Sequence, residues 1–378
     1  MQPLAGRRVL DLGIITAGAG ASAVLADMGA DVIKIESSQY RDPFRRWPGH
    51  ALEDGDSPFF RSTNRAKRSL GLNLKAPGAA AVFLRLVANS DVVVENFRRG
   101  VLERLGIGFA KLAVANPRIV LASISSQGET GPVADHVSFG STLEAMGGLS
   151  WATGYVDGPP IITGRELNYP DQIATVFGAG MVAAALCGGV DEAVHLDLSQ
   201  RELTTYLSGD LFGGAIDAPA RIGNADPLYV LQATAVADDG KWIAVSVRHD
   251  QASLLASIVG SSSEAAFENW LAHRPSAAAV AALNNVGIAA DLVRAGDQLL
   301  GDDRVWSSAL GEDQSGMLVK GSPFLIGDDD PGRYADARPL GGDTRAILRD
   351  VGGYDDAAIE ELAATGIVEG VDRAAVAA

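Results

Sequence analysis

The order of apolar segments in the first 36 residues is the strongest constraint on the fold. Residues 8–13 form a short apolar run typical of a strand, residues 18–28 have a helical composition, and residues 31–36 form a second apolar run. A strand, a helix and a strand joined by short connections indicate a parallel βαβ unit. Predicted strands at 91–95, 118–125 and 194–198, with predicted helices at 76–89 and 141–147, continue the alternation. We therefore predict an α/β fold with a parallel sheet.

The length of the chain and a change of texture predict more than one domain. The chain has 378 residues, which exceeds the usual size of one domain. Beyond about residue 221, two apolar runs flank Asp239 and Gly240, a hairpin signal, and alanine-rich helices follow at 251–285. We predict a large domain over residues 1–215, a smaller α+β domain over 220–312, and a C-terminal segment, 315–378, that returns to the large domain. Residues 38–63 are predicted to be loop.

Charge and composition exclude several classes of partner. The formal net charge is −16 and the sequence pI is about 4.7, which argues against general affinity for nucleic acid or an anionic membrane. The N-terminus has no signal-peptide pattern, and no apolar run is expected to span a bilayer, so we expect a soluble cytoplasmic protein. The single cysteine, Cys187, excludes an internal disulfide and is predicted to pack in the core.

A glycine-rich stretch after the first strand resembles a nucleotide-binding turn but has the wrong spacing. Residues 18–23 formally match the dinucleotide fingerprint, and Glu36 lies where a ribose-binding acid is expected. Residues 14–17, however, separate the strand from the first glycine, whereas a nucleotide-binding turn follows its strand almost immediately. We therefore predict no NAD or flavin site. The five histidines show no metal-ligand spacing with one another or with Cys187, so no metal is predicted.

Two basic clusters are notable in so acidic a chain. Arg65, Lys67 and Arg68 run into a short predicted strand, and Arg98 and Arg99 follow the strand at 91–95, with Arg104 shortly after. The second cluster falls at the carboxyl end of a parallel strand, where open α/β sheets bind ligands. Because the planar guanidinium group of arginine donates two parallel hydrogen bonds, these clusters favour a phosphate-bearing ligand.

Asp171 lies where a proline and an acidic residue open an apolar helix. Residues 172–187 are almost all small or hydrophobic, and Ile173, Val176, Phe177 and Met181 sit at helical spacing, which predicts a buried helix. The preceding stretch, residues 164–171, reads Gly-Arg-Glu-Leu-Asn-Tyr-Pro-Asp and places Asp171 in the first turn. The pattern alone favours a simple helix cap. The alternative is an ionised carboxylate presented as a nucleophile.

Taken together, these residues resemble the family III CoA-transferases, the group that includes formyl-CoA:oxalate and carnitine CoA-transferases. The resemblance covers essentially the whole length, because its motifs recur in the same order and spacing. The matching positions are residues 3–6, 9–11, 25–36, Asn64, residues 67–69, residues 95–98, Gly100, Arg104, residues 157–160, Asp171 and residues 339–342.

The resemblance implies a mechanism and a set of binding residues. The family nucleophile is an aspartate at the position of Asp171, which forms a mixed anhydride and then an aspartyl-CoA thioester. Family members use an acyl-CoA and a carboxylic acid as substrates, and are interlocked homodimers with a Rossmann-like large domain and a small domain. Gln127 and His136 are candidates for the acyl end of the pocket. The residues implied to bind CoA are Ile15, Thr16, Ala17, Lys67, Arg68, Asn96, Phe97, Arg98 and Arg104.

The chief alternative lies within the same fold. α-Methylacyl-CoA racemases resemble these transferases and use a histidine and an aspartate as paired bases, for which His136 and Asp171 are the candidates. The residues after His136, Val-Ser-Phe-Gly, lack the His-Asp-x-Asn-Tyr run typical of racemases, and residues 157–160 also favour the transferases. Ser37 and Ser38, Arg99 and residues 288–290 depart from the transferase pattern. The short glycine run that covers the active site in formyl-CoA transferase has no counterpart near Gly223, so oxalate or formate as the substrate is not implied.

Overall fold

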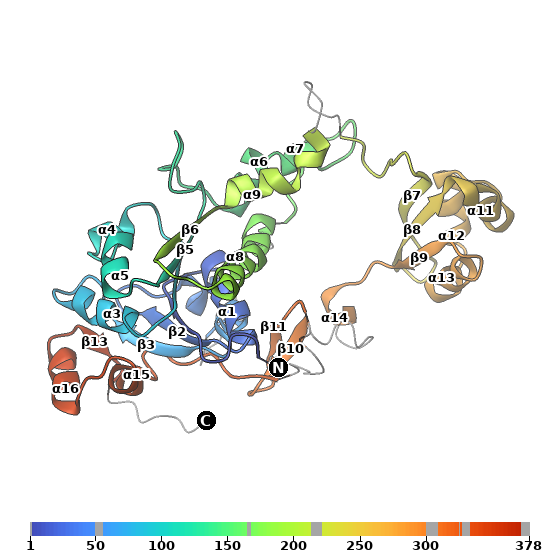
Figure 1. Cartoon of the computed structure of the whole chain (residues 1–378). Helices are drawn as coiled ribbons and strands as arrows, with labels where there is room; N and C mark the ends of the chain where they lie inside the picture. Colours follow the sequence, from blue (N-terminus) through green and yellow to red (C-terminus); the bar gives the residue numbers. More distant parts are fainter. Residues whose placement is uncertain are drawn as a thin grey trace. The chain divides into compact units, whose positions relative to one another are not determined.

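The computed structural model describes residues 2–49, 56–164, 168–212, 221–299, 309–324, 326 and 333–371. The chain forms two compact units, the first comprising residues 1–149, 162–210 and 307–378 and the second residues 150–161 and 211–306 (Figure 1). Residues 150–161, which the sequence analysis placed in the large domain, group with the second unit. The guanidinium of Arg221 accounts for this, since it donates to the carbonyl of Gly158 at 2.7 Å and lies over the ring of Trp151.

The first unit is built on a seven-stranded, mostly parallel sheet, which confirms the predicted α/β class. Its strand order is β13-β3-β2-β1-β4-β5-β6, and only β13 runs antiparallel to its neighbour. The order reverses direction between β1 and β4, which makes the crevice above them the expected ligand site. The strands are β1 (Arg8–Asp11), β2 (Asp31–Glu36), β3 (Arg68–Leu72), β4 (Val92–Glu95), β5 (Val120–Ser125), β6 (Val194–Ser199) and β13 (Val368–Glu369).

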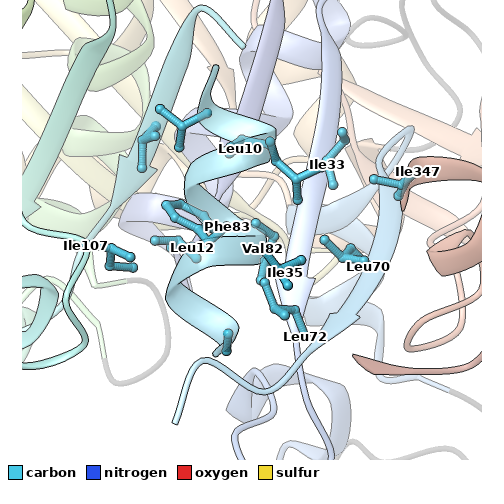
Figure 2. Close-up of a cluster of buried hydrophobic side chains, with 14 of the residues drawn as sticks. Leu10, Leu12, Ile33, Ile35, Leu70, Leu72, Val82, Phe83, Ile107 and Ile347 are labelled. Atoms are coloured by element: carbon cyan, nitrogen blue, oxygen red, sulfur yellow. The ribbon is translucent and has the colours of Figure 1, made fainter. Parts of the chain in front are cut away.

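Helices cover both faces of this sheet. One face packs against α1 (Ala17–Asp27) and α8 (Tyr169–Gly188), and the other against α3 (Ala79–Val87), α5 (Phe109–Ala115), α15 (Thr344–Asp350) and α16 (Asp356–Ala364). Figure 2 shows the core between the sheet and α3, where Val82 and Phe83 of α3 pack against leucines and isoleucines of β1, β2 and β3. The first unit also contains η1 (Pro43–Arg46), α2 (Pro58–Asn64), α4 (Val101–Arg104), α6 (Gly140–Met146) and α9 (Gln200–Leu207), and a small sheet of β10 (Leu310–Asp313), β11 (Leu318–Lys320) and β12 (Arg333–Tyr334).

The segment predicted as loop at 38–63 contains two helices, η1 and α2. Each begins with a proline after a capping side chain, since Asp42 accepts from the N–H of Phe44 and Ser57 accepts from the N–H of Phe60. A capping residue followed by proline is a helix start, and the prediction gave weight only to the turn-forming character of proline.

Close packing between α1 and α8 explains the glycine-rich stretch. A Cβ on Gly20 would lie 2.6 Å from the hydroxyl oxygen of Thr175, and one on Gly18 would lie 2.7 Å from the side-chain oxygen of Asn96. Both glycines lie inside α1. They therefore allow the backbone of α1 to approach its neighbours, a packing role that a fingerprint match does not reveal.

The sequence analysis predicted the wrong face of α8 to be buried. Val176 and Phe177 are each 44% exposed, whereas the residues that face α1 and the sheet are smaller: Ala174, Thr175, Gly178, Ala179, Val182 and Leu186. The contact with α1 accepts mostly small side chains, so Val176 and Phe177 are exposed. Ile173 and Met181 are partly buried against the core. Cys187, expected in the core, is exposed.

The length and composition of α8 also differ from expectation. Its 20 residues, with a mean hydropathy of 1.3 over the most apolar window, would suffice to cross a bilayer, and no other helix among the described residues meets that criterion. A core helix of a soluble protein satisfies the same test. Here α8 packs along α1 and carries Asp171 in its first turn.

The second unit combines an antiparallel sheet with helices. The predicted hairpin is confirmed, because β7 (Tyr229–Val236) pairs antiparallel with β8 (Trp242–Arg248), which pairs with β9 (Ala289–Leu292). Helices α11 (Ala252–Val259), α12 (Glu264–Leu271) and α13 (Ser276–Asn284) bury their apolar residues against this sheet. Its short elements are η2 (His249–Gln251) and α14 (Gly296–Leu299). Helices α7 (Leu149–Ala152) and α10 (Gly209–Phe212) lie where the chain passes from one unit to the other.

Candidate active site

A cavity of about 1030 Å³ lies in the first unit, lined by the segments that follow the carboxyl ends of β1 to β6. Its position agrees with the crevice expected where the strand order reverses. Of the site residues predicted from the sequence, those that line it are Ile15, Thr16, Ala17, Asn96, Phe97, Arg98, Arg104, Gln127, His136 and Asp171.

Asp171 enters the cavity from the first turn of α8. Asn168 begins the helix in a left-handed conformation (φ 46°), and Pro170 follows within the first turn, as predicted. Residues 165–167 of the predicted stretch lie outside the described residues. The Asp171 side chain accepts no backbone N–H of the described residues; instead its Oδ1 accepts a hydrogen bond of 2.6 Å from Nε2 of Gln200. Burial raises the pKa of Asp171, and the hydrogen bond from Gln200 only partly offsets this. The carboxylate is therefore unusually basic for an aspartate.

Gln200 was missed by the sequence analysis, although a usable signal was present. It is the first residue of α9 and directly follows β6, so it lies at the carboxyl edge of the parallel sheet. The predicted helix start is there, since the hydroxyl of Ser199 accepts from the N–H of Glu202 at 3.2 Å. A polar side chain that directly follows the carboxyl end of a parallel strand lies at the edge where such sheets bind ligands. Only the structure shows that it meets Asp171.

The loop between β1 and α1 is held in a strained conformation from several sides. Ile15 has φ 61°, which is a rare conformation for a β-branched residue and costs on the order of 1–3 kcal/mol. The carboxylate of Asp42 accepts the N–H of Ile15 at 3.2 Å, and the Asn96 amide accepts the N–H of Ile14 at 2.8 Å and donates to its carbonyl at 3.0 Å. Buried Lys34 bonds both Gly13 O and Asp42. The cavity wall is thus preorganised.

The cavity has a cationic side formed after β3 and β4. Arg98 and Arg104 are exposed, line the cavity and have no carboxylate partner among the described residues, so their charges are free for an anion. Arg99 lies 3.8 Å from exposed Asp135, a weak pair. Lys75, which the sequence analysis did not select, also lines the cavity, with its ammonium 6.0 Å from the ring centroid of Tyr40.

Lys67 and Arg68, predicted to meet CoA phosphates, lie away from this cavity. The ammonium of Lys67 is buried and bonds Asp11 Oδ2 at 2.8 Å, together with the Ala19 carbonyl and the Asn64 amide oxygen. Arg68 pairs with Asp31 on the adjacent strand at 2.6 Å. Both charges are neutralised within the fold. The cation that follows β3 at the cavity is Lys75, because the chain reaches the ligand edge only after the strand ends.

The loop after β5 contributes uncharged polar groups near Gln200. The Ser126 carbonyl accepts the N–H of Arg201 at 3.1 Å, which ties this loop to the start of α9. Gln127 is 2% exposed; its Nε2 donates to Ser138 Oγ at 2.6 Å, and its Oε1 has no hydrogen-bond partner among the described residues. His136 is exposed on the cavity lining. Among the described residues, no group of three or more His, Cys, Asp or Glu side chains could hold a metal ion.

Comparison with known proteins identifies the family. The sequence profile of CoA-transferase family III matches residues 4–344. The chain belongs to this family. Succinate–glutarate CoA-transferase of Agrobacterium fabrum is 35% identical over 60% of this chain and 58% of its own length, and acetyl-CoA:oxalate CoA-transferase of Acetobacter aceti is 37% identical over the same shares. These matches therefore span somewhat more than half of the relatives' length.

Solved structures show the same fold over nearly the whole chain. A CAIB/BAIF family protein from Brucella suis is 24% identical with a TM-score of 0.82, covering 93% of this chain and 99% of its own. A hypothetical protein from Mycobacterium tuberculosis, also 24% identical, has a TM-score of 0.75 and covers 92% of this chain and 99% of its own. The two-unit architecture of this family III chain is thus shared by other proteins of known structure.

Proposed function

We propose that this protein transfers CoA from an acyl-CoA donor to a carboxylic acid acceptor, with Asp171 as the covalent nucleophile. The observation that carries the proposal is a carboxylate, held by Gln200 in a large cavity, that has no cationic partner among the described residues. The same cavity contains arginines that no described carboxylate pairs with, and the chain belongs to CoA-transferase family III. A carboxylate paired with a cation would be a poor nucleophile. Among the described residues, only Oδ1 of the Asp171 carboxylate accepts a hydrogen bond, which leaves Oδ2 available for attack.

The proposed reaction has four steps and consumes no net proton. A carboxylate oxygen of Asp171 attacks the thioester carbonyl; the carbon–sulfur bond breaks, giving a mixed anhydride and CoA thiolate. The thiolate attacks the aspartyl carbonyl of the anhydride, forming an aspartyl-CoA thioester and releasing the donor carboxylate. The acceptor carboxylate attacks this thioester and expels the thiolate, forming a second anhydride. The thiolate attacks its acceptor acyl carbon, giving the new acyl-CoA and free Asp171.

Several features of the site support this chemistry. The raised pKa of Asp171 reflects a carboxylate poorly solvated by water, which increases its nucleophilicity. The first turn of α8 places the positive end of the helix dipole near that carboxylate and near the negative charge that develops on the attacked carbonyl. Gln200 limits the orientations of the Asp171 side chain.

The cationic side of the cavity supports binding of the CoA nucleotide. Arg98 and Arg104, with Lys75 added from the structure, would meet the phosphates, while Ile15, Thr16 and Ala17 line the path toward Asp171. Gln127 and His136 remain the proposed contacts at the acyl end. The named relatives act on succinate and glutarate or on oxalate, so these acids are the first acceptors to test.

The racemase alternative keeps one supporting observation, because His136 and Asp171 line the same cavity. Two bases on opposite sides of an acyl α-carbon could exchange its proton. Incubation with α-methylacyl-CoAs in deuterated water separates the two functions: α-deuterium incorporation without a carboxylate acceptor supports racemisation, and formation of a new acyl-CoA supports transfer.

We further propose a soluble, cytoplasmic homodimer, interlocked as the family resemblance implies. The outward face of α8 exposes Val176 and Phe177, and α9 exposes Tyr206 and Leu207. A second copy of the chain would cover such an apolar surface. Light scattering coupled to size-exclusion chromatography tests this: a mass of twice 39.2 kDa is expected, and a monomer at micromolar concentration would contradict it.

The transfer itself is tested with an Asp171→Ala variant. Wild-type protein should convert a donor acyl-CoA and a free acid into a new acyl-CoA, and the variant should lose this activity while retaining CoA affinity. Transfer at wild-type rate by Asp171→Ala would overturn the proposed role of Asp171.

A further inference from the structure

Glu95 is a buried carboxylate without a cation. Its residue is 4% exposed at the carboxyl end of β4. Other buried acids of the sheet are neutralised, Asp11 by Lys67 at 2.8 Å and Glu36 by Arg45 at 2.7 Å. Among the described residues, no lysine or arginine forms an ion pair with Glu95. Burying an unpaired carboxylate lowers the free energy of unfolding, so we expect Glu95 to have a role that offsets this cost.

The Glu95 carboxylate holds a turn that lines the proposed CoA cavity. Its Oε2 accepts the backbone N–H of Phe97 at 2.7 Å. Phe97 and its neighbours Asn96 and Arg98 all line the cavity, and the Asn96 amide clamps Ile14 on the opposite strand connection. Through the turn at Phe97, Glu95 thus supports the segments that follow β1 and β4, the two strands between which the strand order reverses. Glu95 itself does not line the cavity.

A short hydrogen-bonded path joins Glu95 to the surface. Ser123 pairs with Glu95 across β4 and β5, and its hydroxyl hydrogen-bonds the carboxylate. The same hydroxyl lies 2.9 Å from Nε2 of His195, an exposed residue of β6 whose ring stacks on Phe109. When Glu95 is ionised, Ser123 donates to it and His195 donates to Ser123. When Glu95 is protonated, both donations reverse, so a proton can pass between solvent and Glu95.

We propose that Glu95 is a positioning residue for CoA, and that its ionised form holds the turn at Phe97 in the geometry that binds CoA. The inference rests on the proposed function, because it assumes that the cavity binds CoA. A hydrogen bond to an ionised carboxylate is stronger than one to a neutral acid, so the turn is firmest when Glu95 has lost its proton.

Burial, with a smaller contribution from nearby acids, raises the pKa of Glu95 into the neutral range. Burial raises the pKa of Glu95 to about 7, opposed by the hydrogen bonds from Ser123 and from the N–H of Phe97, and the nearby acids Glu129 and Glu103 raise it further. The pKa of Glu129 is itself raised by burial and by Asp197, and lowered by His195 and Arg99. CoA affinity should therefore be highest above pH 7 and fall as the pH drops through this value.

The test is the CoA dissociation constant, measured by calorimetry between pH 6 and pH 8.5 for wild type and two variants. Glu95→Gln is isosteric and permanently neutral, so it should bind CoA several-fold more weakly than wild type at pH 8 and about equally at pH 6. The CoA phosphate titrates identically in both samples, so the ratio of the two constants isolates Glu95. The control His195→Gln should keep the wild-type pH dependence.

Three results would overturn the inference. A ratio of one at every pH would show that the charge of Glu95 does not affect CoA. Loss of the pH dependence in His195→Gln would assign the titration to His195. A ratio above one but constant with pH would give Glu95 a purely structural role. Absence of CoA binding by the wild type at any pH would instead reject the proposed function on which this inference rests.

Discussion

Gln200 donates a hydrogen bond of 2.6 Å to Asp171, joining the first residue of α9 to the first turn of α8 inside the cavity. This bond engages one oxygen of the carboxylate and fixes its plane. It also stabilises the ionised form against the desolvation that raises the pKa of Asp171. A single neutral donor therefore sets both the orientation and the charge of the proposed nucleophile.

Replacing Gln200 by leucine should slow turnover by about 10- to 100-fold, the range expected for loss of a hydrogen bond to a charged group. Since the lost bond favoured the ionised form, the pKa of Asp171 should rise further. The acid limb of the kcat profile should consequently move to higher pH. An unshifted acid limb in steady-state assays across pH would show that Gln200 does not contact the reacting carboxylate.

Asp171→Asn should be inactive and yet more stable than wild type at neutral pH. The folded pKa of Asp171 is raised, so the native state binds its proton more tightly than the unfolded chain does. Native stability is then lost as pH rises from the unfolded pKa through the folded pKa, and the full penalty applies above it. Asparagine removes this penalty and keeps an acceptor for Gln200. Urea denaturation should show a higher midpoint for the variant at pH 8, with the difference vanishing in acid.

Arg104→Ala should weaken CoA binding by about tenfold and reduce its dependence on salt, because an unpaired cation beside a phosphate contributes mainly electrostatically. Pantetheine, which lacks the phosphates, should bind both forms equally. Arg68→Ala is the matched control, because Arg68 was predicted to bind CoA but lies outside the cavity and pairs with Asp31. Its loss should leave CoA affinity unchanged. A tenfold loss in Arg68→Ala would favour the sequence-based assignment.

Arg45→Met should destabilise the protein by about 3–5 kcal/mol, the cost of leaving a buried partner charge unpaired. The Arg45 guanidinium bonds both oxygens of Glu36, at 3.0 and 2.7 Å, and stacks 3.8 Å over the ring of Phe60. Adding Glu36→Leu should restore part of the stability, as measured by chemical denaturation. A double variant weaker than Arg45→Met alone would contradict this account.

The sequence predicted the sheet and its ligand edge because local patterns determine both. β2 was predicted with its observed bounds, since a β-branched apolar run between a glycine turn and a polar loop leaves little freedom. Asp171 was selected from its position at a helix start, and Arg98 and Arg104 from the segment that follows a strand, together with the family resemblance.

What the sequence did not predict depends on packing between distant segments. The outward direction of Phe177 follows from the small side chains of α1, about 150 residues earlier in the chain. Lys67 looked like a ligand cation until Asp11, on another strand, was seen to neutralise it. Gln200 could be recognised as a site residue only from its hydrogen bond to Asp171, which lies 29 positions earlier in the chain. No local pattern encodes which charges will find partners.

The central claim, that Asp171 is a covalent nucleophile, is tested most directly by intact-protein mass spectrometry after incubation with a panel of acyl-CoAs, with and without hydroxylamine. The account predicts a hydroxylamine-sensitive acyl or CoA adduct that maps to Asp171 and is absent from Asp171→Asn. If no acyl-CoA gives an adduct while one exchanges its α-hydrogen with deuterated water, Asp171 is a base and the transferase account is contradicted.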